Sequence, residues 1–315
     1  MVRFMTKRFS IVGLIAISSL FVVSCGNDDP TIGLAGTMHG GSGEGEALYQ
    51  KAKSLDDSGK PEKAVKIYKE VADEYAMSPS AAQARYRQAE ILEQQGEIFK
   101  SFNAFQQFLQ RYQSSNLYSK ALNSQVKMTQ AVADGKVKAS FLGLKSKIST
   151  KEIVEMLGKL RDNAPRSEIS ANAQFKIGEI YQTEKDYKES IEAYRKLVRD
   201  QPETSQAAEA LFRVGVVFLE QADGGNHNQA TLKLADEAFN DYLLQYPSHS
   251  KNAEAKRLLS GLKGRDLDSS LAIAKFYDRT GKIESAKVYY REIVKNSKTG
   301  SAHDYAKTRL KELGE

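Results

Sequence analysis

The chain has 315 residues, of which 41% are hydrophobic and 27% are charged, so most of it can fold around a hydrophobic core. The formal net charge of +6 includes Arg3, Lys7 and Arg8, and without these three residues it is near +3. Basic and acidic residues interleave along the chain without a stripe of arginine and aromatic residues, so we expect no nucleic-acid partner.

The first 24 residues have the pattern of a secretory signal peptide. The three basic residues precede an apolar run from Phe9 to Val23, and no acidic residue occurs before Asp28. The run is shorter than the roughly 18 apolar residues that a membrane-spanning helix needs, and it contains three serines. We therefore predict that residues 1–24 are cleaved.

The end of this segment, Val22-Val23-Ser24-Cys25, resembles the lipobox of bacterial lipoproteins. The resemblance implies that Cys25 carries a diacylglycerol and an N-acyl chain, and that Gly26 favours sorting to the outer membrane. The alternative is an unmodified cysteine beside an ordinary cleavage site. Cys25 is the only cysteine, so no disulfide can form within the chain.

Residues 25–45 are rich in glycine and have no periodic apolar face, which predicts a flexible tether. The glycines do not form a phosphate-binding loop, because no strand precedes them and no Gly-Lys-Ser/Thr ending follows.

From Glu46 onward, apolar residues recur at spacings of three and four, and small and aromatic residues repeat in a fixed order. Ala52, Leu55, Gly59, Ala64, Tyr68 and Val71 match Ala89, Leu92, Gly96, Ser101, Phe105 and Phe108; Gly178, Tyr181, Ser190, Tyr194, Leu197 and Pro202 match Gly215, Phe218, Ala235, Phe239, Tyr242 and Pro247; and the last unit contains Ala274, Tyr277, Gly281, Ala286, Tyr290 and Ile293.

This pattern resembles the tetratricopeptide repeat, a pair of antiparallel helices. The resemblance implies an all-α solenoid over residues 46–315, with about six helix pairs and a C-terminal capping helix from about Ala302 to Leu313. Two departures stand out: an interruption near 135–150 and an expanded loop near 223–230.

No pattern in the chain predicts an enzyme or a metal site. His39, His227, His249 and His303 are far apart in sequence, and no serine has a Gly-x-Ser-x-Gly setting. Glu62, Glu70, Glu152 and Glu189 are expected on solvated helix faces. We expect no catalytic residue, and no cofactor besides the lipid on Cys25.

Two regions are candidate interaction surfaces. The interruption combines lysines with Phe141, Leu142 and Leu144, and it either forms an exposed hook or packs these residues on adjacent helices.

The second candidate surface is a groove, because in tetratricopeptide proteins the first helix of each pair lines one. By repeat position this places Tyr49, Lys53, Tyr86, Glu90 and Glu93 in a peptide-binding groove, although both tyrosines could instead be packing residues.

The lipobox, the tether and the inter-repeat turns at 163–167, 200–205 and 245–250 together resemble the BamD family of outer-membrane assembly lipoproteins. The resemblance extends to a helix at 253–259, followed by an aromatic-ended helix at 271–277 and Gly281. It implies a scaffold that is anchored to the outer membrane, faces the periplasm, and binds the β-barrel insertase, other assembly subunits and unfolded outer-membrane proteins.

Repeats of this kind are generic, so two alternatives stay open. One is another periplasm-facing tetratricopeptide lipoprotein, such as a pilotin-like adaptor or a cell-envelope coordinator. The other is a cell-wall hydrolase, which the lack of paired acids or of a nucleophile disfavours.

Overall fold

The computed structural model describes residues 42–136, 139–141, 144–146, 148–224 and 229–315. These residues form thirteen helices and one two-stranded hairpin. The elements in chain order are α1 (Ser42–Asp57), α2 (Pro61–Glu74), α3 (Ala81–Gln94), α4 (Ile98–Arg111), α5 (Tyr118–Ala133), β1 (Ala139–Phe141), β2 (Leu144–Ser146), α6 (Thr150–Asn163), α7 (Glu168–Glu184), α8 (Tyr187–Asp200), α9 (Ser205–Gly224), α10 (Gln229–Gln245), α11 (Asn252–Arg279), α12 (Ile283–Asn296) and α13 (Ser301–Glu312).

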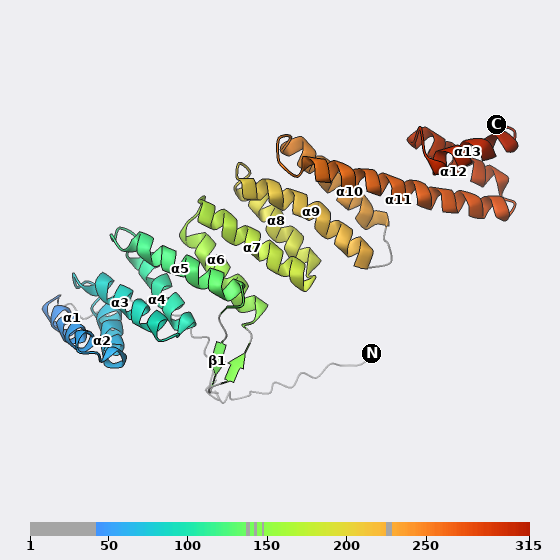
Figure 1. Cartoon of the computed structure of the whole chain (residues 1–315). Helices are drawn as coiled ribbons and strands as arrows, with labels where there is room; N and C mark the ends of the chain where they lie inside the picture. Colours follow the sequence, from blue (N-terminus) through green and yellow to red (C-terminus); the bar gives the residue numbers. More distant parts are fainter. Residues whose placement is uncertain (1–41, 137–138, 142–143, 147, 225–228) are drawn as a thin grey trace, which may run out of the picture.

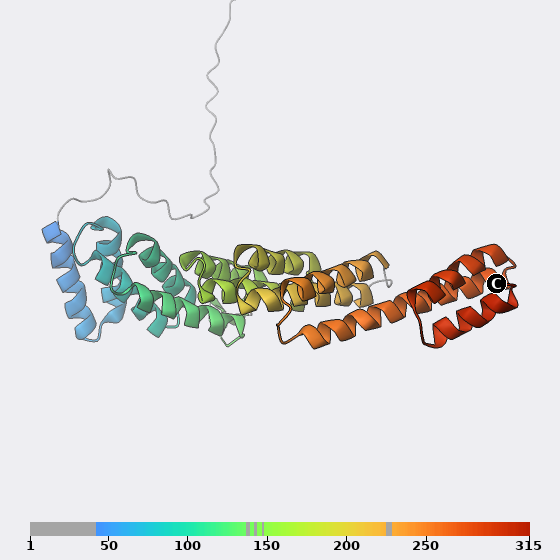
Figure 2. The same ribbon diagram turned by 90° about the horizontal axis from the view of Figure 1, so that it is seen from above.

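The helices form six consecutive pairs, from α1–α2 to α11–α12, and α13 follows the last pair. The pairs are arranged in chain order as an elongated solenoid (Figure 1). Seen from above, α11 extends away from the earlier pairs toward α12 and α13 (Figure 2). The predicted all-α solenoid with six helix pairs and a C-terminal capping helix is confirmed.

Small residues on the first helix of a pair allow an aromatic ring of the second helix to pack against the backbone. A Cβ atom added at Gly178 would lie 2.5 Å from the Tyr194 ring, and one at Gly215 would lie 2.6 Å from the Phe239 ring. Ser190 Oγ also donates a hydrogen bond of 2.9 Å to the Gly178 carbonyl oxygen. The repeated small and aromatic positions therefore set how closely the paired helices approach.

The first helix begins earlier than predicted. We expected the tether to extend to residue 45, but α1 starts at Ser42, and Gly45 is buried against the turn after α2. A Cβ atom at Gly45 would lie 2.7 Å from Tyr75 Cβ. This glycine therefore belongs to a close helix contact, which a composition rich in glycine cannot distinguish from a tether.

A hairpin lies between α5 and α6, where the sequence predicts an interruption. β1 and β2 pair antiparallel, with Ala139 opposite Ser146. The chain then enters α6 through a capping box, in which Glu152 N donates to Ser149 Oγ and Ser149 N donates to the Glu152 carboxylate. Whether the hairpin side chains form an exposed hook stays a prediction.

Three amide side chains, two of them buried, connect the second and third pairs. Gln125 Nε2 donates to Gln106 Oε1 over 3.0 Å, and Asn163 Nδ2 donates to the side-chain oxygens of both glutamines over 2.6 and 2.7 Å. The three residues lie on α5, α4 and α6. Because buried polar groups are costly without partners, this network favours a single register of the three helices.

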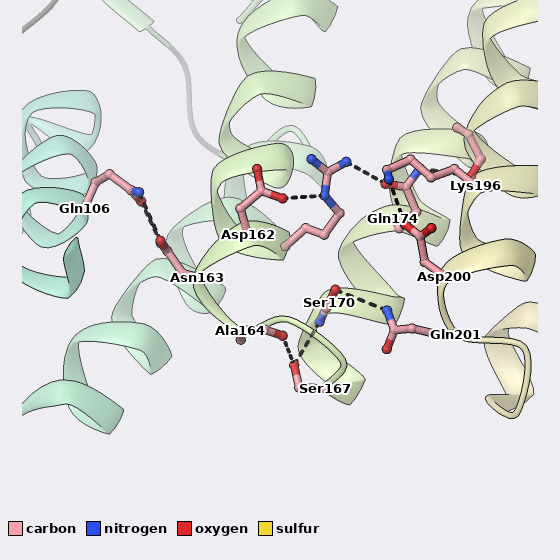
Figure 3. Close-up of polar contacts among 12 residues, drawn as sticks. Gln106, Asp162, Asn163, Ala164, Ser167, Ser170, Gln174, Lys196, Asp200 and Gln201 are labelled. Atoms are coloured by element: carbon pink, nitrogen blue, oxygen red, sulfur yellow. Dashed lines mark hydrogen bonds and ion pairs between the residues drawn. The ribbon is translucent and has the colours of Figure 1, made fainter. Parts of the chain in front are cut away.

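Polar contacts continue from α6 to α8, as Figure 3 shows. Arg161 Nη1 donates to Gln174 Oε1 over 2.8 Å, and Gln174 Nε2 donates to the Ala193 carbonyl oxygen over 2.9 Å. Gln201 Nε2 donates to Ser170 Oγ over 3.1 Å. These bonds connect each helix to its successor in the middle of the solenoid.

The segment after residue 252 differs from the prediction. The sequence predicts two helices, at 253–259 and 271–277, whereas the structure has one continuous helix, α11. Gly261 and Gly264 lie within it on open sides, where a Cβ atom would meet nothing within 4 Å. Glycine weakens a helix interior by about 1 kcal/mol each, which packing on both halves of α11 offsets.

The two halves of α11 belong to different hydrophobic cores. Ala255, Leu259 and Leu262 are buried in the core that α8, α9 and α10 share. Ala274 is buried in a separate core with residues of α12 and α13, against which Leu267 is partly buried. The C-terminal unit, formed by the second half of α11 with α12 and α13, therefore has a core of its own.

Candidate functional site

The first helices of the first two pairs bring four of the five predicted groove residues together. Tyr49 and Lys53 lie on α1, and Tyr86 and Glu90 lie on α3. They line a hollow of about 390 Å³, which we call the N-terminal hollow. Its other lining residues are Asp56, Asp57, Tyr68, Gln83, Arg87 and Leu117.

The fifth predicted residue, Glu93, is not among the lining residues. It lies on α3, three residues beyond Glu90, and is partly buried. Burial and, to a smaller extent, the neighbouring Glu90 carboxylate raise the pKa of the Glu93 side chain. The position of Glu93 in the repeat did not by itself show that this residue lies beyond the N-terminal hollow.

An ion-paired clasp forms the wall of the N-terminal hollow. The Asp56 carboxylate accepts hydrogen bonds from Arg87 Nε over 2.6 Å, from Arg87 Nη2 over 3.2 Å and from the Tyr68 hydroxyl over 3.5 Å. Arg87 Nη1 also donates to Glu90 over 3.1 Å. Mainly because of Asp56, the pKa of the Arg87 guanidinium is raised above its usual value. This clasp joins α1, α2 and α3.

Asp56 and Arg87 were not among the residues predicted from the sequence. Asp56 follows Lys53 by three residues, and Arg87 precedes Glu90 by three, so each shares a helix face with a predicted residue. This spacing was the signal that could have identified both. The salt bridge between Asp56 and Arg87 depends on how α1 and α3 pack against each other. The periodicity within one helix does not predict that packing.

Each predicted tyrosine packs against the core and also faces the hollow. The Tyr49 ring lies 5.8 Å from the Tyr68 ring, and the Tyr86 ring lies 5.6 and 5.7 Å from the rings of Phe105 and Phe108. Both tyrosines are partly exposed. The two roles that the sequence left open, packing and ligand contact, are therefore compatible.

Both signs of charge border the aromatic rings. Lys53 Nζ lies 2.6 Å from the Asp57 carboxylate, and both side chains are exposed. Burial and the Glu90 carboxylate raise the pKa of the Tyr86 hydroxyl. Half-exposed rings with charges of both signs are suited to holding an extended peptide by side-chain packing and orientation.

A second, mostly apolar hollow lies near the middle of the solenoid. It has a volume of about 310 Å³, and α5, α6 and α7 line it. Leu157 and Leu160 of α6 contribute, the polar residue Asp134 directly follows α5, and Asn172 and Lys176 lie on α7. This hollow was not predicted from the sequence, because its walls come from three helices.

The lipobox residues Val22, Val23 and Ser24, and Cys25 itself, lie outside the described residues, as do His39 and His227. Among the residues that the structure describes, no three histidine, cysteine, aspartate or glutamate side chains are grouped closely enough to hold a metal ion. None of the described helices combines the length and the apolarity that a membrane span requires.

The chain is similar to several solved structures at low identity and with low TM-scores. YrrB, titled a TPR protein with an unusual peptide-binding site, is 15% identical over 67% of this chain and 90% of its own, with a TM-score of 0.31. MamA from Desulfovibrio magneticus RS-1 is 19% identical over 67% and 99%, with a TM-score of 0.28. RapI is 14% identical over 82% and 100%, with a TM-score of 0.33. No curated protein matches the sequence.

Two family models match the chain. A tetratricopeptide repeat model matches residues 49–116, which include all the lining residues of the N-terminal hollow except Leu117. The model of the outer membrane lipoprotein family YfiO matches residues 143–312, just over half of the chain. Both families consist of protein-interaction scaffolds. The chain therefore belongs to the YfiO, or BamD, family of outer membrane lipoproteins.

Proposed function

We propose that this protein is a scaffold of the β-barrel assembly machinery, which binds the insertase and unfolded outer-membrane protein segments. The observation that carries the proposal is the family match over residues 143–312. The solenoid supports it, because stacked helix pairs present a long surface for several protein partners.

We assign the anchor to Cys25 and the periplasm as the compartment. The residues Val22-Val23-Ser24-Cys25 support lipidation, and Gly26 supports outer-membrane sorting by resemblance. Two or more acyl chains hold a protein stably on a membrane, whereas one chain holds it only reversibly. The predicted tether would then keep the solenoid close to the membrane surface.

We assign unfolded substrate segments to the N-terminal hollow. Its exposed ring surfaces from Tyr49 and Tyr86 can receive apolar side chains of an extended chain. Lys53 and Glu90 provide opposite charges that can orient the segment. Substrates of many sequences require tolerant contacts of this kind rather than one deep, shape-selective pocket.

Depletion of the protein in its native cells tests the proposed function. We expect the levels of outer-membrane barrel proteins to fall, and affinity capture of the full chain from solubilised membranes to retrieve the insertase. Normal barrel-protein levels after depletion would contradict the proposal. Capture of a different envelope assembly without the insertase would instead favour another tetratricopeptide adaptor.

Substitution of the two tyrosines tests the site. Tyr49→Ala with Tyr86→Ala should weaken binding of peptides from a barrel-protein sequence by about tenfold, because two aromatic anchors are lost. Tyr181→Ala is the matched control, since Tyr181 is also partly buried on a first helix but lies outside the hollow. Circular dichroism must show unchanged helicity, and equal binding by both variants would place the site elsewhere.

A further inference from the structure

An apolar stripe on α11 continues beyond the helix that covers its first half. Leu259 and Leu262 are buried in the core shared with α10, and Ser269 Oγ accepts a hydrogen bond of 3.0 Å from Gln229 Nε2 at the start of α10. One and two turns further along the same face lie Ile273 and Phe276. They are 38% and 53% exposed, because α10 begins at Gln229 and does not extend along this part of α11.

The repeat shows what normally covers these two positions. Ile273 precedes the small residue Ala274 by one position, and Phe276 follows it by two. In three of the four internal pairs, the residues at both positions are buried or partly buried, and the packed ones contact the second helix of the preceding pair. These residues are Gln88 and Ile91 on α3, Ile177 and Ile180 on α7, and Val214 and Val217 on α9. The exception is α5, where the equivalent residues Lys127 and Gln130 are polar and exposed.

The second helix of the C-terminal unit forms another wall of this open face. Tyr289 on α12 stacks on Tyr277 with ring centroids 5.7 Å apart, and Phe276 meets Tyr277 edge to face, also at 5.7 Å. The positions equivalent to Tyr289 in α8 and α10 are Ala193 and Ala238, which are buried. We call Ile273, Phe276, Tyr277 and Tyr289 the open groove.

The first pair of the solenoid provides a comparison, because no described helix precedes it and its equivalent face is also uncovered. Its positions equivalent to Ile273 and Phe276 are Lys51 and Ser54, which are polar and exposed. A free end of the array is therefore compatible with a polar face. The open groove instead has the composition of an internal interface, although no described helix occupies it.

We propose that the open groove is a docking site for one short amphipathic helix of another protein. Continuity with the α10–α11 interface supports a helix as the occupant, because a helix in line with α10 would cover Ile273 and Phe276. The inference is independent of the proposed role in barrel assembly.

The contact between α8 and α9 indicates the pattern that the occupant needs. Ile191 and Val198 of α8 pack into the core that contains Val214 and Val217, and the Arg195 guanidinium lies 5.7 Å from the Phe218 ring. Residues 191, 195 and 198 therefore form a stripe at i, i+4 and i+7. Phe218 is equivalent to Tyr277 in the open groove. A helix with aliphatic residues at the two ends of such a stripe and a long side chain between them would therefore fit this surface.

The size of the open groove favours a single helix over a second copy of the chain. The exposed parts of its aliphatic and aromatic side chains amount to on the order of 300 Å². Stable dimers bury about 800 Å² on each partner, which is far more than this surface offers. A short helix anchored by two or three side chains matches the available area.

A helical peptide tests the proposal. The probe is a fluorescent, hydrocarbon-stapled peptide with the sequence of α8 (residues 187–200), because an unstapled peptide of this length is barely helical in water. It is titrated with the full lipidated chain in detergent. We expect saturable binding that Ile273→Ser with Phe276→Ser weakens at least tenfold, and no binding of a peptide with the scrambled sequence.

Leu244→Ser is the matched control, because Leu244 is an 81% exposed apolar residue on α10 outside the open groove. It should leave the affinity unchanged, and circular dichroism should be the same for all variants. The proposal is overturned if the peptide does not bind, or if the double variant binds as tightly as the unsubstituted chain. It is also overturned if light scattering shows a dimer that the double variant converts to a monomer, because a second copy then occupies the groove.

Discussion

The first and last units of the solenoid share a clasp but differ in the faces that they expose. In the first unit, Asp56 binds Tyr68 and Arg87, which follow it by 12 and 31 residues. In the C-terminal unit, Asp278 binds Tyr290 and Arg309 at the same two spacings.

Around these equivalent clasps the surfaces diverge. The N-terminal hollow has two half-exposed tyrosines, and the adjacent end face of α1 is polar. The C-terminal unit has an equivalent hollow of about 360 Å³ with Tyr305 in its wall, but its distinctive surface is the apolar open groove. The two end units thus share the contacts that hold three helices together, whereas their exposed residues differ, as surfaces for different partners would require.

The largest expected effect concerns the cores of the two units. Tyr290→Ala removes a fully buried ring and should destabilise the C-terminal unit by about 3–5 kcal/mol. Hydrogen exchange should show lost protection only in the second half of α11, in α12 and in α13, because these three segments share a separate core. Tyr68→Ala should instead also reduce protection in α3, whose Ile91 shares the core of Tyr68. If Tyr290→Ala also reduced protection in the helices of the preceding pair, as Tyr68→Ala is expected to do in α3, the C-terminal core would not be separate.

A second experiment transfers the open groove to the other end. Lys51→Ile with Ser54→Phe places the residues of the open groove on the equivalent face of α1. Isothermal titration of the full chain with the stapled α8 peptide should then show a second equivalent bound, with an affinity within about tenfold of the first. Lys51→Ser alone is the control, and a stoichiometry unchanged from it would show that these two positions are not sufficient.

A smaller effect is expected at the turn that both end units share. Gly59 and Gly281 have φ values of 73° and 74°, whereas Lys185 holds the same turn position in the fourth pair with φ of 64°. Gly281→Ala should lower the free energy of unfolding by about 1 kcal/mol, and Lys185→Gly should raise it by up to about 1 kcal/mol. Urea unfolding measures both, and a destabilising Lys185→Gly would contradict this account of the turn.

The smallest expected effect is the acid sensitivity of the C-terminal clasp. The Arg309 guanidinium holds the pKa of Asp278 below its usual value of about 3.9. Because the folded-state pKa is the lower one, the stabilisation is complete above about pH 3.9 and is lost as the pH falls through the folded-state value. Asp278→Asn should make protection of α12 and α13 less dependent on pH below about 4. Asp162→Asn, at an exposed ion pair, is the control and should change nothing.

Much of the fold followed from local pattern. The alternation of small and aromatic residues, such as Gly178 with Tyr194, predicted the helix pairs, because this contact is made between neighbours in sequence. The continuous α11 did not follow, since Gly261 and Gly264 resemble breakers until it is known that their open sides face no neighbour.

The candidate site was predicted only in part, for a related reason. Repeat position predicted a groove with Tyr49 and Tyr86, and both residues line the N-terminal hollow. It did not predict Arg87, whose contact depends on Asp56 lying on another helix, and it included Glu93, which is not among the lining residues of the hollow. The open groove depends on the offset between α10 and α12 along α11, a distance that no short sequence window contains.

Photocrosslinking in the native membrane tests most directly the claim that the two end units serve different partners. One full-length variant carries a photoreactive phenylalanine at Gln83, an exposed residue of the N-terminal hollow, and another carries it at Phe276 in the open groove. We predict that position 83 captures unfolded barrel-protein chains, and that position 276 captures an amphipathic helix of a different, folded protein. The same partners at both positions, or no barrel protein at position 83, would contradict the account.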